Sequence, residues 1–439
     1  MDISRAATAA TQYIRTLVAI PLLFASQHAL AADAPLTLAE AQRRAVGRSQ
    51  QLVAQDFAIA ASREMAVAAA QFPDPVATLG INNLPVNGSD AWSLTRDFMT
   101  MRSVGVMQEL TREEKRQARV ERFDREAEKS LAEKSSRVAA IQRDTALAWL
   151  DRYYAEAQSA VVADQIRQAR LEIEAADTAY RAGRGNLADV LGARSALVLF
   201  DDRASELSRR VSAARIALAR WVGDIADAPL SGKPAIEAIR LDPQTLDTAF
   251  QHHPQIAVLA RQEDVAAAEV RVAQANKKAD WSVQLMYSQR GPAYSNMVSV
   301  GVSVPLQWDQ KNRQDREVAA KLAVLDQARA EREDVLRAHT AEVRAMIAEW
   351  ENDRERSARY ARELVPLATE RTQATLVAYR SAKASMGDVL LTRRNEIDVR
   401  MQALQLEADA ARLWAQLSFL IPIDDTVTHS SLNQPKDSQ

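Results

Sequence analysis

The chain has 439 residues, enough for two or three ordinary domains, and its 12 glycines and 14 prolines are few, as in a mostly helical protein. It contains no cysteine, which excludes disulfides, thiolate metal sites and a lipid anchor on an N-terminal cysteine. Charged residues make up 26% of the chain but nearly cancel to a net charge of -2, so we expect no nucleic acid as a partner.

The first residues have the pattern of an export signal, and we predict a signal peptide over 1–31. Arg5 and Arg15 supply positive charge, an apolar core runs from Leu17 to Ala25, and Ala29-Leu-Ala31 offers a cleavage site. The apolar core is shorter than the ~20 residues that span a bilayer. No later segment reads as a transmembrane helix, so a membrane-embedded part would have to consist of strands.

A first structural repeat is predicted over 32–222. Two short helices precede an alternating segment at about 76–84, and a second alternating segment covers about 98–108. Val106 to Ala182 then contains neither glycine nor proline, and one helix of that length is roughly 110 Å long at ~1.5 Å per residue. A return helix follows from about Leu187 to Val222. The repeat therefore contains a strand pair and a helix too long for a globular domain.

A linker at 223–240 leads into a second repeat over 241–422 with the same plan. Its strands are predicted at about 281–288 and 296–306, where valines alternate with serines and a glycine. Another very long helix follows, with one interruption at Pro366. The tail at 423–439 is polar, and we predict disorder there.

Short identical motifs support the duplication. They occur in the same order in both halves: Ser103-Val-Gly-Val106 and Ser299-Val-Gly-Val302, Ala179-Tyr-Arg181 and Ala378-Tyr-Arg380, Asp189-Val-Leu191 and Asp388-Val-Leu390. The predicted fold class is mainly α with a small β part, built from a duplicated unit of helix, strand pair, long helix and return helix.

Four strands per chain are too few for a membrane structure by themselves, because an open sheet in lipid leaves two unpaired edges. Two copies would close an eight-stranded barrel filled by side chains, whereas three would close twelve strands around a lumen. Trp281 and Tyr287 suit positions at the membrane interface. Soluble hairpins packed on helices are the alternative interpretation of these segments.

The sequence offers no catalytic constellation, and we predict that the protein is not an enzyme and has no cofactor. Neither a G-x-S-x-G nor a phosphate-binding G-x-x-x-x-G-K-[ST] motif occurs. His252 and His253 are adjacent and so face different directions on a helix, and no metal site is predicted there. Met99, Met101 and Met107 suit a barrel wall better than a soft-metal site.

Asp189 and Asp388 each follow a turn between a long helix and its return helix. Either aspartate can cap the return helix, or the pair can form an ion-facing ring that gates a channel, and the two roles are compatible.

Four motifs carry a resemblance to a known family over nearly the whole mature chain. They are Leu36-Thr-Leu-Ala-Glu-Ala41, Ser299-Val-Gly-Val-Ser-Val-Pro-Leu306, and the two turn segments Ala179–Arg194 and Ala378–Arg393. In this order the chain resembles the TolC-like outer-membrane efflux factors. The stretch Gln108-Glu-Leu110 with Glu114-Lys-Arg116 is similar to the outer-membrane component of heavy-metal pumps of the CzcC/CusC type. Here Glu114 replaces a glycine, and Leu391 replaces a second acidic residue after Asp388.

The resemblance implies a homotrimer with a twelve-stranded barrel in the outer membrane and a helical barrel in the periplasm. It also implies two partners, a periplasmic adaptor (membrane fusion) protein and an inner-membrane RND pump. The adaptor would dock on the two turns, at Gly183, Arg184, Gly185, Ser385 and Gly387. From the turn sequences we expect positive φ at Gly185 and Gly387. We also expect docking grooves of alternating charge, because one turn has Arg184 where the other has Ala384.

The predicted function is that of a passive conduit in the outer membrane, which exports cargo handed over by the pump, heavy-metal cations in the first place. Drug efflux and type I protein secretion are alternatives within the same class. A periplasmic coiled-coil scaffold or adaptor without a pore is an alternative from another class, which the duplicated strand pairs disfavour.

Overall fold

The computed structural model describes residues 35–233, 235–241 and 253–422, so the predicted signal peptide and tail lie outside the described residues. The chain divides into two compact units. We name them the helical unit (Met1–Arg48, Thr145–Ala235 and Ser357–Ala408) and the sheet unit (Ser49–Asp144, Ile236–Arg356 and Asp409–Gln439). Each unit takes segments from both predicted repeats, so the compact units are not the repeats themselves.

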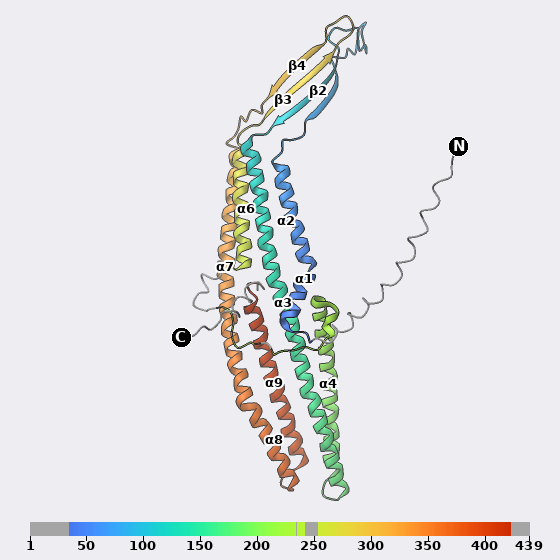
Figure 1. Ribbon diagram of the computed structural model, residues 1–439, viewed down its shortest axis with the longest axis vertical. Coiled ribbons are helices and arrows are strands. Elements are labelled where there is room, and N and C mark those ends of the chain that lie inside the picture. Colours follow the sequence, from blue (N-terminus) through green and yellow to red (C-terminus); the bar gives the residue numbers. More distant parts are fainter. Residues whose placement is uncertain (1–34, 234, 242–252, 423–439) are drawn as a thin grey trace, which may run out of the picture. The chain divides into compact units, whose positions relative to one another are not determined.

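The sheet unit contains one antiparallel sheet, drawn with its helices in Figure 1. Its strands are β1 (Val76–Asn82), β2 (Met101–Leu110), β3 (Trp281–Gln289) and β4 (Met297–Ser303), in the order β1-β2-β3-β4. The first hairpin comes from one repeat and the second from the other, and β2 pairs with β3 across the repeats.

The helices of this unit are α2 (Gln50–Ala69), the first part of α3 (Glu113–Arg181), α6 (Pro254–Asn276) and α7 (Gln314–Arg359). Ala266 and Val270 of α6 pack on Leu325 and Ala328 of α7. Charged side chains of α3 form ion pairs on its surface, among them Glu121 with Arg271 of α6 at 2.8 Å.

The strand ends differ from the predicted ones for local chemical reasons. β2 begins at Met101 rather than near residue 98, because Asp97 Oδ1 accepts the backbone N–H groups of Met99 and Thr100 and holds that segment in a turn. β4 ends at Ser303 rather than 306, two residues before Pro305, which has no N–H to donate to a neighbouring strand.

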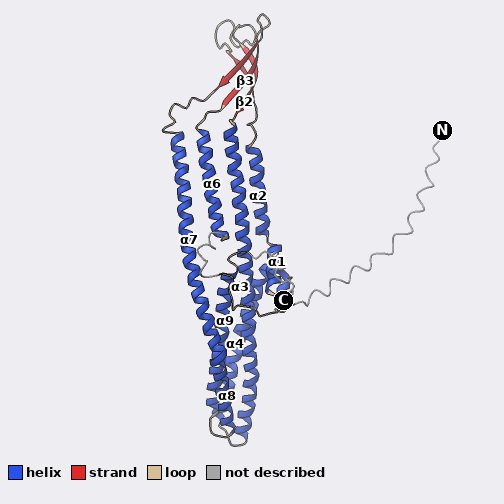
Figure 2. Ribbon diagram, turned by 60° about the vertical axis from the view of Figure 1, so that its left-hand side comes forward, coloured by secondary structure: helices blue, strands red, loops and turns tan. Residues whose placement is uncertain are grey.

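The helical unit contains α1 (Leu38–Arg48), the second part of α3, α4 (Leu187–Val222), α8 (Val365–Arg380) and most of α9 (Met386–Ser418). Figure 2 draws the helices of both units in blue and the strands in red. Two small cores hold the unit together: Ala169, Phe200 and Ile397, and Ala176, Val190, Met386 and Val389. Both cores join α3 and α4 of the first repeat to α9 of the second.

The predicted linker is partly ordered and packed. Its first residues form the 3₁₀ helix η1 (Gly223–Asp227), and Leu36 pairs with Leu230 in a parallel bridge. Trp149 is fully buried, and its indole N–H donates to the Leu36 carbonyl at 3.1 Å. The segment before α1 is thereby tied to the segment after α4.

The second long helix is interrupted one turn before the predicted proline. The π-helix η3 (Tyr360–Leu364) separates α7 from α8, and the Val365 N–H donates to Tyr360, five residues back. Pro366 lacks an N–H and its ring would clash with the carbonyl four residues earlier. A single wide turn relieves both problems and lets the helix continue.

Candidate functional site

One face of the sheet is apolar and uncovered by any described part of the chain. Directly opposite residues share a face, and one row across all four strands is Leu79, Val104, Tyr287 and Val298. The next row is Ala77, Val106, Leu285 and Val300. Leu79 is 81% exposed and Val300 is 72% exposed. An apolar face of this size needs a second copy, another protein or lipid to cover it.

The opposite face carries mainly small and polar residues, together with several methionines. Thr78, Gly105, Met286 and Ser299 form one row across the four strands, and Gly80, Ser103, Ser288 and Met297 form the next. A Cβ on Gly105 would lie 3.0 Å from the Leu285 carbonyl oxygen, so this position suits glycine. One apolar face and one face rich in small and polar residues are typical of a barrel wall between lipid and water.

Trp281 and Tyr287, the predicted interface residues, both lie on the apolar face. Trp281 is the first residue of β3 and lies opposite Leu110. Tyr287 lies two residues before the other end of the same strand, opposite Val104. Their exposed fractions are 47% and 44%. The structure therefore places two aromatic rings toward the two ends of one apolar face.

Asp280 joins the sheet to α3 at the start of β3. Its carboxylate accepts the Arg112 N–H at 3.0 Å and the Lys115 ammonium at 2.5 Å, and both charged side chains of the pair are largely buried. Sequence reasoning missed this contact, because Asp280 and Lys115 lie far apart in the chain. The contact holds the start of β3, in the second repeat, against the start of α3, in the first repeat.

The two turns of the helical unit have the same backbone, but not at the residues expected from the sequence. Positive φ occurs at Gly183, with φ of 69°, and at Ala382, with φ of 59°. The next residue in each turn donates its N–H back across the end of the long helix, Arg184 to Ala179 at 2.9 Å and Lys383 to Ala378 at 2.8 Å. This is a common way for a helix to end.

The expectation of positive φ at Gly185 and Gly387 was therefore wrong. Gly185 is needed for close approach instead, since a Cβ there would lie 3.1 Å from the Tyr180 nitrogen. Gly387 lies in the first turn of α9, and its counterpart in the first repeat is Ala188. The structural match pairs Arg184 with Lys383, so the expected alternation of charge was also wrong, and both turns carry a cation.

Each return helix begins with a side-chain cap at matching positions. The Asn186 side chain accepts the Asp189 N–H at 2.8 Å. Ser385 Oγ accepts the Asp388 N–H at 3.1 Å, and the Asp388 carboxylate accepts both the Ser385 hydroxyl and its N–H. The Ser385 hydroxyl is the main reason that the Asp388 pKa is lowered. Asp388 thus completes a capping box, one of the two roles considered for it.

Asp189 is in a different environment from Asp388. It is partly buried, and its carboxylate makes no hydrogen bond to a side chain in the described ranges. Burial, and then the negative charge of Asp189, raise the pKa of Tyr379 on α8. Ala176, Val190, Met386 and Val389 pack beneath both turns, with Tyr379 against the same cluster. The two turns are therefore neighbours in one unit.

A buried ion cluster lies in the helical unit, and sequence reasoning did not find it. Arg393 of α9 donates through Nε and Nη2 to Glu172 of α3 at 3.1 Å and through Nη1 to Glu396 at 3.2 Å. Arg400 contacts Glu396 at 2.7 Å. Burial raises the pKa of Glu172, and the charge of Arg393 opposes that effect. The spacings within α9 suggest ion pairs, but the partner on α3 has no signal in the sequence.

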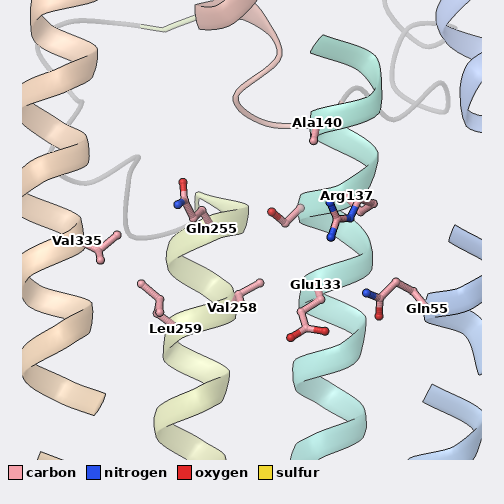
Figure 3. Close-up of a pocket in the computed structure, with 9 residues that line it drawn as sticks. Gln55, Glu133, Arg137, Ala140, Gln255, Val258, Leu259 and Val335 are labelled. Carbon is pink, nitrogen blue, oxygen red and sulfur yellow. The ribbon is translucent and has the colours of Figure 1, made fainter. Parts of the chain in front are cut away.

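One opening of the sheet unit lies between helices and is lined by both polar and apolar side chains. A cavity of about 450 Å³ in the sheet unit is lined by residues of α2, α3, α6 and α7. Figure 3 shows Glu133 and Arg137 on α3 with Gln55 on the neighbouring α2. Glu133 lies 3.8 Å from Lys129, so its charge is partly compensated.

Within residues 35–233, 235–241 and 253–422 there is no group of three or more His, Asp or Glu side chains that could hold a metal ion. His253 and His339 do meet, with ring centroids 4.5 Å apart, while His252 lies outside the described residues. In the same ranges no helix is both long and apolar enough to span a bilayer.

No protein-family model matches the chain, and no curated protein matches it either. Solved structures match it closely in three dimensions. The outer-membrane channel OprN superimposes with a TM-score of 0.72 at 17% identity, over 88% of this chain and 90% of that one. CusC, described as forming a transmembrane channel, gives 0.71 at 13% identity over 88% and 93%. The CmeC outer-membrane channel of Campylobacter jejuni gives 0.68 at 13% identity over 90% and 88%.

These identities are low, but the likeness covers 88–90% of this chain and 88–93% of each of the three others. The fold class predicted from the sequence is thereby confirmed. The chain has the fold of the TolC-like outer-membrane efflux channels.

Proposed function

We propose that this protein is the outer-membrane channel of a tripartite efflux pump, a passive conduit that reaches from the outer membrane into the periplasm. The observation that carries the proposal is the sheet. One of its faces is apolar and exposed, and the other is rich in small and polar residues. Each of its two edge strands lacks a second neighbour among the described residues. Lipid can cover such a face only if the edges are paired. Three copies close the strands into a twelve-stranded barrel with a lumen.

A direct test is to express the full chain with its leader and to purify it from membranes in detergent. The proposal predicts a stable assembly of three chains by native mass spectrometry. It also predicts ion-conducting steps when the protein is added to planar lipid bilayers. A soluble monomer that never conducts would instead favour the periplasmic scaffold or adaptor, the alternative without a pore.

The two turns are the proposed docking face for a periplasmic adaptor protein, which connects the channel to an inner-membrane RND pump. Gly183, Arg184, Gly185 and Ser385 lie in these turns, and Gly387 follows in the first turn of α9. Lys383 joins them as the counterpart of Arg184. Three copies would present six turns, alternately from the first and the second repeat, and each turn would carry one cation. A ring of six cations favours acidic side chains on the adaptor surface.

Asp189 and Asp388 are proposed to line the inner opening of the channel. Asp388 already caps α9, so its negative charge is held in place by Ser385. Asp189 has no such hydrogen bond, and its replacement by Asn should leave α4 capped by Asn186. Asp189→Asn is therefore the cleaner test of an ion-facing role. It should lower the preference for cations in bilayer recordings, and unchanged selectivity would leave no gating role for this residue.

The proposed cargo is heavy-metal cations, with drugs and type I secretion substrates as alternatives. The proposal rests on the partial match at Gln108-Glu-Leu110 and Glu114-Lys-Arg116, and CusC is one structural neighbour among several channels. Deleting the gene should raise sensitivity to zinc, cadmium, cobalt, copper or silver salts. Sensitivity to dyes and antibiotics alone would select drug efflux.

A further inference from the structure

The apolar face of the sheet ends in a single arginine. Arg102 lies on β2 opposite Ile81 of β1 and Gln289 of β3, in the row beyond Leu79, Val104 and Tyr287. Alternation along β2 puts Arg102 on the same face as Val104 and Val106. Under the proposed function, this is the rim of the lipid-facing surface at the end of the sheet farther from the helices.

Arg102 has no partner among the residues that the structure describes. No carboxylate lies within 4 Å of its guanidinium, and its buried Nε makes no hydrogen bond. An arginine that rests on an apolar surface and lacks a counter-ion is costly, unless its head reaches an anion at the membrane surface.

The neighbouring charges are already engaged. Arg96 lies 3.8 Å from Asp90, and Asp97 accepts the N–H groups of Met99 and Thr100. Arg290 donates to the Phe98 carbonyl and lies over the Tyr294 ring at 5.1 Å. Of these three arginines, Arg102 is the one that makes neither a hydrogen bond nor an ion pair within the described residues.

Aromatic and aliphatic side chains surround the same end of the sheet. Trp92 is 69% exposed in a loop where its backbone has a φ of 61°, and Trp92 N–H is held by the Pro85 carbonyl at 2.7 Å. Phe98 and Leu94 are also exposed. An aromatic ring with a cation beside it is typical of a protein surface at lipid headgroup level.

We propose that Arg102 binds a phosphate of the outer-leaflet glycolipid, the lipid A class, and so fixes the depth and rotation of the barrel in the membrane. The inference rests on the proposed function. The planar guanidinium presents parallel N–H donors that match a phosphate, and the arginine stem and its apolar neighbours match the acyl chains. Closing the barrel from three copies repeats the site three times around the rim.

The test is lipid binding by the purified detergent-solubilised protein, followed by native mass spectrometry. The probes are bis-phosphorylated lipid A and the same lipid with its phosphates removed. The wild-type protein should retain the phosphorylated lipid, and Arg102→Gln should weaken that binding at least tenfold. Arg102→Lys, which keeps the charge without the fork, should fall between them. Arg316→Gln is the matched control, since Arg316 is an exposed arginine at the start of α7 with no ion pair among the described residues.

Equal retention by wild type and Arg102→Gln, or equal binding of both forms of the lipid, would overturn the inference. Displacement of lipid A by an equal concentration of inorganic phosphate would also overturn it, because the site would then select free phosphate. The mass of each variant is read in the same spectra. A wild-type protein that is not an oligomer would refute the proposed function instead, so the two failures can be told apart.

Discussion

Each of the two turns contains one residue with positive φ, and the residue type at that position differs between the repeats. Gly183 adopts positive φ at little cost, whereas Ala382 adopts it with a Cβ. The sequence motif Tyr-Arg at each turn located both turns correctly. The motif could not identify the residue with positive φ, because the second turn has Ala382 at that position and a glycine, Gly387, only five residues later.

Exchanging the two residues should have opposite effects. Ala382→Gly is expected to stabilise the folded chain by up to about 1 kcal/mol, because it relieves strain at positive φ. Gly183→Ala is expected to destabilise it by about 1 kcal/mol. Urea unfolding of the purified protein measures both. Gly387→Ala, in the first turn of α9, serves as the control and should be neutral or slightly stabilising. Destabilisation by Ala382→Gly, or stabilisation by Gly183→Ala, would contradict the observed turn geometry.

Protonation of one buried histidine should make the sheet unit acid-sensitive. His253 caps α6 by accepting the Gln255 N–H at 3.3 Å, and burial, then the charge of His339, lowers its pKa to about 4. Glu342, 3.8 Å from His339, opposes the shift at His339. A lowered pKa means that the unfolded state binds the proton first, so stability is complete above about pH 6.5 and falls as the pH drops toward 4.

Between pH 7 and pH 5 this histidine is expected to cost about 2 kcal/mol of folding free energy. His253→Asn keeps a capping side chain without a titrating group, and it should flatten the pH dependence. The measurement is the urea midpoint of the two proteins at both pH values. A variant that loses as much stability as the wild type would show that other groups carry the acid sensitivity.

At the level of elements, the sequence was informative wherever a local rule decides. Thr37 caps α1 in the way its spacing from Glu40 allows, since its Oγ1 accepts the Glu40 N–H at 3.2 Å. The helix α4 begins and ends at the predicted residues Leu187 and Val222. Pro366 signalled an interruption but not its form, because a π-helical turn depends on how the whole helix is held. Contacts between repeats, such as Lys115 with Asp280 or Glu172 with Arg393, have no local signature and could not be predicted.

The buried cluster between α3 and α9 gives a sharp element-scale test. Arg393→Met leaves Glu172 and Glu396 buried beside only Arg400, and it should destabilise the folded chain by about 3–5 kcal/mol at pH 7. Without the arginine the Glu172 pKa should rise further above its unfolded value. The folded variant then binds the proton more tightly, so its deficit should shrink as the pH is lowered to 5.

Arg394→Met is the matched control for this experiment, because Arg394 is the exposed neighbour on the same helix. It should change stability by no more than about 0.5 kcal/mol at either pH. Thermal or urea unfolding at pH 5 and pH 7 provides the comparison. A pH-independent deficit in Arg393→Met would mean that lost packing, rather than uncompensated charge, accounts for it.

At the scale of the whole molecule, the sheet is incomplete by itself. The order β1-β2-β3-β4 leaves one side of β1 and one side of β4 without a strand partner in the described structure, and the apolar face spans all four strands. The repeat pattern and the rule against open edges in lipid were enough to predict several copies. Under the proposed function, closure of the sheet depends on contacts between copies, and the sequence of one chain indicates them only through its unpaired edge strands.

The most direct test is to join the edge strands of neighbouring copies with introduced cysteines, which the natural chain lacks. Within one chain, β1 and β4 are separated by three strand spacings, about 14 Å, which is too far for a disulfide. Pairs that place one cysteine in β1 (76–82) and one in β4 (297–303) should therefore crosslink only between copies. Within the register that pairs the two edge strands, every second residue pair should react, because side chains alternate between the two faces. The account predicts a covalent trimer on denaturing gels from those pairs. Failure of every pair to crosslink, or a covalent dimer as the end product, would contradict closure of the barrel by three chains.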